Sequence, residues 1–183
     1  NAATVGGNLC NASPAGDMLV PLLVLEARVL LASKADGALR SRALPLAKFL
    51  TGPGRTARAS SELVVAVEIP APPPGFRGGF HKFGARPALD ISTISIGVGA
   101  VREGEVLRGV RVAFGAVAPT ALRAPRTEAA LEGRVPDEAA VDAALAAAEA
   151  EIHPIDDVRA SGWYRRELVR NILRRVIARV SEH

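Results

Sequence analysis

The chain has 183 residues, of which 49% are hydrophobic, and a formal net charge of +4. This length supports one ordinary domain or two small ones, and the hydrophobic content excludes an intrinsically disordered chain. The longest apolar stretch, residues 18–32, is interrupted by Pro21, Glu26 and Arg28, and a membrane helix needs roughly 20 apolar residues. The N-terminus also lacks the basic region and apolar core of a signal peptide. We therefore expect no membrane partner and a cytoplasmic location.

Composition argues against two further kinds of function. Aromatic residues make up only 4% of the chain, so a stacking platform for nucleic acid is not expected. Cys10 is the sole cysteine, and the three histidines are scattered without metal-ligand spacing. An iron–sulfur cluster or structural zinc site would need more ligands than these. Any metal chemistry is therefore expected on a partner chain.

The first half of the chain predicts mixed helix and sheet. Residues 1–17 form a loop rich in small polar residues, followed by a helix over 17–26, with Ser13 as N-cap and Pro14 at the first helical position. Strands are expected over residues 27–33, 38–44, 62–70 and 78–85. A turn at 34–37 separates the first two strands, a helical turn follows over 45–50, and 51–56 is expected to be a loop. We expect no regular structure in 51–56, because two glycines flank a proline there.

The second half predicts a long hairpin followed by helices. Apolar residues alternate in 91–117, which turns at 102–105, and helices are expected over 124–133, 136–152 and 160–180. The last helix has one apolar stripe, and arginines 166, 170, 174 and 179 lie off it. Those arginines form either a solvated face or a docking surface for a partner subunit.

The opening loop has the features of an anion site. Gly6 and Gly7 allow a ligand to approach the backbone closely, Thr4 and Asn8 add polar side chains, and the following helix directs its positive end toward the loop. An ordinary turn would also explain the glycines, and Asp17 could simply stabilise a helix start. Neither a P-loop nor a Rossmann fingerprint is present.

Four stretches together resemble the FAD-binding medium subunit of the molybdenum hydroxylases, the xanthine dehydrogenase and carbon monoxide dehydrogenase family. They are ATVGGNLCNASPAGD, LTGPGRTARASSELVVAVEIP, FHKFGARPALDISTISIGVGA and PIDDVRASGWYRRELVRNILRRVI, in this order along nearly the whole chain. The resemblance implies an α+β fold: the second half of a PCMH-type, vanillyl-alcohol-oxidase-like FAD-binding domain over 1–86, and a C-terminal antiparallel sheet with helices over 87–183.

The resemblance also implies roles for individual residues. The loop that holds the FAD pyrophosphate corresponds to Thr4, Val5, Gly6, Gly7 and Asn8. Asp17 corresponds to an acidic residue that hydrogen-bonds the flavin nucleotide, Val64 to an apolar position near the ring, and Lys82 to a lysine near the ring's carbonyl end. Phe80 occupies a position where some members have a tyrosine against the flavin, although core packing would also explain it. Arg86 and Asp90 are expected to form a structural ion pair, and no catalytic residue is expected.

For the complex, the resemblance implies electron transfer by an oxidoreductase. A large subunit would carry the molybdenum cofactor, a small subunit the [2Fe-2S] clusters, and FAD on this chain would pass electrons to NAD, oxygen or another acceptor. Family members have a first flavin subdomain before this point, which nothing here supplies, so a separate chain could provide it. Two alternatives remain: a scaffold or truncated remnant that binds partners but no FAD, and a phosphate- or nucleotide-binding domain unrelated to redox chemistry.

Overall fold

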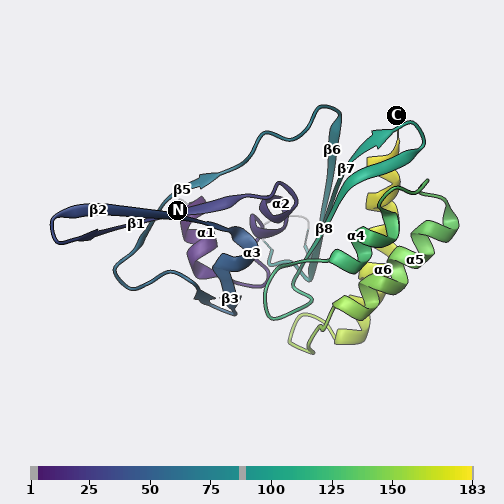
Figure 1. The fold of residues 1–183 in the computed structure, drawn as a ribbon. Helices are drawn as coiled ribbons and strands as arrows, with labels where there is room; N and C mark the ends of the chain where they lie inside the picture. The colour runs from purple at the N-terminus through teal and green to yellow at the C-terminus, as the bar shows by residue number, and fades with distance from the viewer. Residues whose placement is uncertain (1–3, 87–89, 183) are drawn as a thin grey trace.

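The computed structural model describes residues 4–86 and 90–182, and it contains two antiparallel sheets of three and four strands and a short hairpin (Figure 1). The N-terminal elements are α1 (Val5–Asn11), α2 (Leu19–Val24), β1 (Arg28–Ala35), β2 (Ala38–Pro45), α3 (Leu46–Phe49), β3 (Leu50–Gly52), β4 (Arg55–Thr56) and β5 (Leu63–Glu68). The elements that follow are β6 (Phe76–Phe83), β7 (Ile94–Glu103), β8 (Val106–Gly115), β9 (Leu122–Arg123), α4 (Pro125–Leu131), α5 (Glu138–Glu151) and α6 (Gly162–Ser181). The expected α+β fold with an antiparallel C-terminal sheet is confirmed.

The three-stranded sheet has the order β2-β1-β5, with β1 in the centre. Its β1–β2 hairpin projects from the body of the protein (Figure 1). The turn consists of Asp36 and Gly37, which have φ angles of 51° and 77°, as a tight hairpin turn requires. Strand β5 is the other outer strand of this sheet, and Leu63 and Val65 on it are more than half exposed.

The four-stranded sheet has the order β6-β7-β8-β9 and is covered on both faces (Figure 1). One face of β7 presents Ile94, Ile96 and Val98 to the core formed with α4, α5 and α6. The opposite face presents Gly97 and Gly99 to α2, where added Cβ atoms would lie within 3.0 Å of valine side chains of that helix. The predicted alternation in this hairpin is confirmed, and the glycines are explained by the close approach of α2 and, at Gly99, of the Phe76 ring.

The predicted helix over 17–26 is present as α2, but its predicted N-cap is wrong, and so is the predicted loop at 51–56. The helix expected from residue 17 begins at Leu19, and Ser13 instead accepts a hydrogen bond from the Ala15 amide in the preceding turn. The segment 51–56 is not an irregular loop, because β3 and β4 pair around a turn in which Gly54 has a φ of 66°. A glycine at a turn permits a hairpin as readily as it ends a strand.

The division of the chain at residue 86 remains a prediction. Strand β6 pairs with β7 along its whole length, from Phe76 opposite Val101 to Phe83 opposite Ile94. We propose that the division lies before β6, within residues 69–75, because β6 belongs to the second sheet by its hydrogen bonds.

No helix among the described residues is long and apolar enough to cross a membrane.

Candidate functional site

The glycine-containing segment at the start of the chain is a short helix, so its prediction as a loop is wrong. Thr4 is the N-cap of α1, with extended backbone, and its Oγ1 accepts a hydrogen bond from the Gly7 amide at 2.9 Å. The helix also buries Leu9 completely, and this packing outweighs the poor helix propensity of two glycines. The amides of Val5 and Gly6 lie in the first turn, where a helix supplies no acceptor.

The first turn of α1 lines one wall of an open groove of about 510 Å³. The opposite wall is β5, and the two walls bring together Thr4, Val5, Gly6 and Val64 of the predicted site residues. The remaining lining residues are all apolar: Met18, Leu22, Val65, Ala66, Val67 and Ile69. A pocket of this size and character, with a few backbone donors at one end, is typical of cofactor sites.

The structure explains the presence of glycine differently at the two glycine positions of α1. A Cβ on Gly7 would lie 2.9 Å from Thr4 Oγ1, so glycine there avoids crowding the oxygen that caps the helix. A Cβ on Gly6 would meet no atom within 4 Å, and no positive φ is recorded at Gly6. Glycine inside a helix costs roughly 1 kcal/mol relative to alanine. The chain's own fold therefore gives no reason for Gly6, whereas a ligand lying against the backbone would.

Asn8 is a predicted site residue that does not line the groove. Its Oδ1 is shielded from solvent and accepts no hydrogen bond from any described residue. A Cβ on Gly16 would lie 3.1 Å from this oxygen, so Asn8 packs against the turn before α2.

Asp17 and Lys82, which are 65 residues apart in sequence, form an ion pair. Lys82 Nζ donates to Asp17 Oδ2 at 2.7 Å and to the Asp90 carbonyl oxygen at 2.7 Å. Ser92 Oγ donates to the other oxygen of Asp17, Oδ1, at 2.9 Å. The pair does not line the groove, although Asp17 directly precedes Met18, which does. The predicted residues therefore include one set that lines the groove, on α1 and β5, and a second set, Asp17 and Lys82, that forms the ion pair. The two sets are connected along the chain through Asp17 and Met18.

Asp90 fixes the end of the β6–β7 connection. Its carboxylate accepts hydrogen bonds from the amides of Arg86 and Ile91 at 2.8 and 2.9 Å, and the expected ion pair with Arg86 has an N–O distance of 4.0 Å. The hydrogen bond from the Arg86 amide is the main reason why the pKa of Asp90 is lowered. A Cβ on Gly84 would lie 2.8 Å from Asp90 Oδ2, so glycine leaves room for this carboxylate.

Phe80 lies two residues before Lys82 on β6, so both side chains point to the same face of the sheet. Phe80 is 40% exposed and lines a separate cavity of about 190 Å³ with Pro21, Val24 and other residues. Ser92 is the residue that sequence reasoning missed. No sequence signal marks it, because a serine before an apolar strand is unremarkable until Asp17 is placed beside it.

Comparison with known proteins places the chain in a family. Residues 1–72 match the family model described as "FAD binding domain in molybdopterin dehydrogenase", and residues 80–180 match "CO dehydrogenase flavoprotein C-terminal domain". The chain belongs to the FAD-binding subunits of the molybdenum hydroxylases. The predicted family is confirmed, and the two matching models describe a FAD-binding domain and a flavoprotein domain.

Relatives of this flavoprotein family align with almost all of the chain. It is 30% identical over 179 residues to the xanthine dehydrogenase FAD-binding subunit of Escherichia coli O157:H7, covering 97% of this chain and 60% of that protein. It is 32% identical over 170 residues to the glyceraldehyde dehydrogenase medium chain of Sulfolobus acidocaldarius, covering 93% of this chain and 58% of that protein.

Solved structures agree with the sequence relatives. Reconstituted CO dehydrogenase from Oligotropha carboxidovorans has a TM-score of 0.90 at 29% identity, covering 98% of this chain and 61% of that one. Quinoline 2-oxidoreductase from Pseudomonas putida 86 has a TM-score of 0.86 at 28% identity, covering 98% and 60%. The chain thus spans about three fifths of the length of these proteins. Within residues 4–86 and 90–182, no three His, Cys, Asp or Glu side chains gather as metal ligands do.

Proposed function

We propose that this chain holds FAD in the groove between α1 and β5 and serves as the electron-transfer subunit of a molybdenum hydroxylase. Bound FAD would supply the redox chemistry, accepting electrons and passing them on. The chain's own residues bind and orient the cofactor and set the charge around it. The proposed cofactor site comprises Thr4, Val5, Gly6 and Val64, which line the groove, Asp17 and Lys82, which form the ion pair, and Gly7 and Asn8, which belong to the same helix as the groove residues.

The groove is the observation that carries this proposal. FAD combines a flat ring system, apolar at its dimethylbenzene end, with a charged pyrophosphate, and the groove offers an apolar wall on β5 together with the first-turn amides of α1. The space above Gly6 permits direct approach to those amides. Outside the groove, the ion pair of Asp17 and Lys82 supplies a carboxylate and an ammonium group that are 2.7 Å apart. These donors and acceptors fit FAD.

The partners belong to the same proposal. Electrons would come from a large subunit with the molybdenum cofactor through [2Fe-2S] clusters on a small subunit, and leave to NAD, oxygen or another acceptor. The open groove is rimmed by the exposed side chains of Val5, Val65 and Ile69. We propose that a segment outside these 183 residues, in the same polypeptide or a separate chain, closes the groove and supplies the rest of the pyrophosphate site. We propose a cytoplasmic location for the complex.

The first test is the visible absorption spectrum of the purified protein, followed by heat release and chromatography of any cofactor. A flavin spectrum with FAD released at about one per chain, or acquired on titration, supports the proposal. Protein that stays colourless with excess FAD, alone and with its partner subunits, would contradict it and favour the scaffold alternative.

The Gly6→Ala variant tests whether the groove is the binding site. We expect FAD affinity to fall by at least about tenfold, because a methyl group would stand between the ligand and the first-turn amides. The melting temperature of the FAD-free protein should stay the same or rise, since alanine is the better helix former. Gly52→Ala is the matched control, because its Cβ would make only ordinary contact, at 3.5 Å, with Arg55 outside the groove. Equal FAD affinity in the two variants would place the site elsewhere.

A further inference from the structure

The ion pair between Asp17 and Lys82 is held by groups on both sides. Asp17 lies in the segment between α1 and α2, whereas Lys82 lies near the end of β6. The end of β6 is tied to the start of β7 by a hydrogen bond from the Thr93 amide to the Phe83 carbonyl oxygen, at 2.8 Å. The residues that contact Asp17 are therefore fixed by the backbone of two paired strands.

Ser92 is almost completely buried, with 1% of its surface exposed, and its hydroxyl group reaches Asp17 Oδ1. This contact leaves Oδ2 directed at Lys82 Nζ. On the other side of the amine, the Asp90 carbonyl oxygen accepts a second hydrogen bond. Because the Asp90 carboxylate binds backbone amides on both sides of the connection, this carbonyl group is also held in place.

The pair is open on its remaining side. The side chains of Lys82 and Asp17 are 29% and 49% exposed. An ammonium group has three donors and a carboxylate has about four acceptor positions, so the contacts above leave one N–H on Lys82 and lone pairs on Asp17 for a ligand. A ligand beside them would experience the positive charge of Lys82 offset by a carboxylate 2.7 Å away, rather than an isolated ammonium group.

We propose that Ser92 and the Asp90 carbonyl group are positioning groups that hold Asp17 as the counter-ion of Lys82, and thereby set the net charge presented to the flavin. The inference rests on the proposed function, because it assigns the pair to the flavin site. Removing Asp17 would expose the flavin to the full charge of Lys82, and removing Ser92 would free the carboxylate to turn away.

The contact itself can be tested without cofactor, because the chain contains three lysines: Lys34, Lys48 and Lys82. Lys34 and Lys48 are exposed and serve as internal references. Acylation of the FAD-free protein by an amine-reactive ester, followed by peptide mass spectrometry, gives a rate for each lysine. We expect Lys82 to react more slowly than the references. Asp17→Asn and Ser92→Ala should raise its rate about two- to fivefold, the size that a partly exposed ion pair supports.

Ser92→Thr is the matched control, because it keeps the hydroxyl group and should restore the slow reaction. An unchanged Lys82 rate in Ser92→Ala, or no rescue by Ser92→Thr, would overturn the role of Ser92. In FAD-loaded protein, the midpoint potential should rise in Asp17→Asn and, less strongly, in Ser92→Ala, and fall in Lys82→Met. If the midpoint potential is unchanged in Asp17→Asn while the acylation rates change as expected, only the proposed effect of the pair on the flavin is refuted. Failure to bind FAD would refute the proposed function and leave the acylation result standing.

Discussion

Arg165 carries a charge into the core beneath the four-stranded sheet. It is 3% exposed, and its guanidinium group donates to the carbonyl oxygens of Thr93 and Ala116 at 3.0 and 2.6 Å. It also contacts both oxygens of Asp157 at 2.7 Å. Burial raises the pKa of Asp157, but hydrogen bonds from nearby amides and from Arg165 lower it on balance. Arg165 therefore joins α6 to the starts and ends of the central strands.

Replacing Arg165 with alanine should destabilise the protein by about 3–5 kcal/mol, because it leaves a carboxylate and two buried carbonyl oxygens without their donor. Urea unfolding followed by circular dichroism measures this difference. Arg166→Ala is the control on the same helix: this neighbour is more exposed and makes one contact with the Glu149 carbonyl oxygen at 3.2 Å, so a change within about 0.5 kcal/mol is expected. Similar losses in both variants would show that Arg165 acts only through general helix stability.

At the level of residues, the sequence predicted the polar groups but not their geometry. The family motif selected Asp17 and Lys82, and the structure places them 2.7 Å apart. The sequence did not indicate Ser92 or the buried Arg165, because a serine before a strand and an arginine in an arginine-rich helix have many ordinary explanations. Contacts between residues 65 or more positions apart depend on tertiary packing, which a single sequence does not display.

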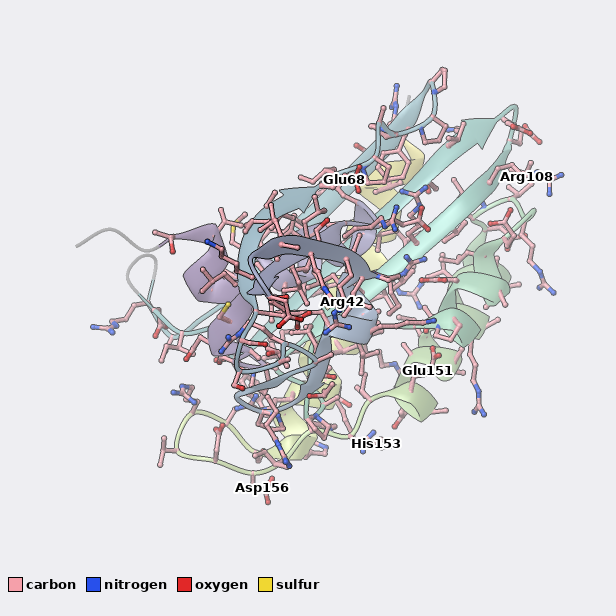
Figure 2. The ribbon with its side chains drawn as sticks, turned by 60° about the vertical axis from the view of Figure 1, so that its left-hand side comes forward. Arg42, Glu68, Arg108, Glu151, His153 and Asp156 are labelled. Atoms are coloured by element: carbon pink, nitrogen blue, oxygen red, sulfur yellow. The ribbon has the colours of Figure 1, made fainter. Side chains whose placement is uncertain are left out.

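Among the elements, the β1–β2 hairpin is tied to the segment before β5 by an ion pair on β2. Arg42 on β2 contacts both carboxylate oxygens of Glu62 at 2.6 and 2.8 Å, and the Ala59 amide donates to Glu62 as well (Figure 2 labels Arg42). The hydrogen bond from Arg42, followed by that from Ala59, lowers the pKa of Glu62 from 4.5 to about 2. The pair thus connects β2 to the segment that leads into β5, one wall of the groove.

This lowered pKa predicts how stability changes with pH. Between about pH 4.5 and 2, the unfolded chain binds a proton at Glu62 that the folded chain does not, so the stability due to Glu62 is complete above pH 4.5 and is lost toward pH 2. Urea midpoints of the native protein and of Glu62→Gln should differ most at neutral pH and converge as the pH falls. Adding Arg42→Met to Glu62→Gln should change the urea midpoint little, because the ion pair is already absent. A pH-independent difference would mean that the pair does not form in solution.

The predicted elements were most accurate where periodicity is long. The alternation of β7 and β8 and the apolar stripe of α6 were recovered, because each repeats over ten or more residues. Helix α1 and the β3–β4 hairpin were missed. Both are short and contain glycines, and both are stabilised by contacts outside themselves, including the burial of Leu9 and a hydrogen bond from the Gly54 amide to the Ala12 carbonyl oxygen.

For the whole molecule, helix α2 is the element that joins two hydrophobic cores. One core lies between the four-stranded sheet and α4–α6, and the other contains α2 and β1, with Ala113 of β8 at its edge. Arg111 on β8 donates to the Val24 carbonyl oxygen at 3.2 Å, pairs with Glu26 at 3.0 Å and lies 5.0 Å over the Phe76 ring. It therefore holds the C-terminal end of α2 against the sheet that both cores share.

Because neither core can open without exposing a face of that sheet, we expect one cooperative unfolding transition, with equal calorimetric and van't Hoff enthalpies. Arg111→Met should lower stability by about 1.5–3 kcal/mol, the range for hydrogen bonds to charged groups, and broaden or split the calorimetric peak. The control is Arg108→Met on the same strand (labelled in Figure 2), whose side chain is half exposed and pairs with Glu103 at 3.7 Å. That variant should unfold like the native protein, since such surface pairs contribute little. If the native protein itself unfolds in two separate transitions, or if both variants behave alike, α2 does not couple the two cores in the way these contacts indicate.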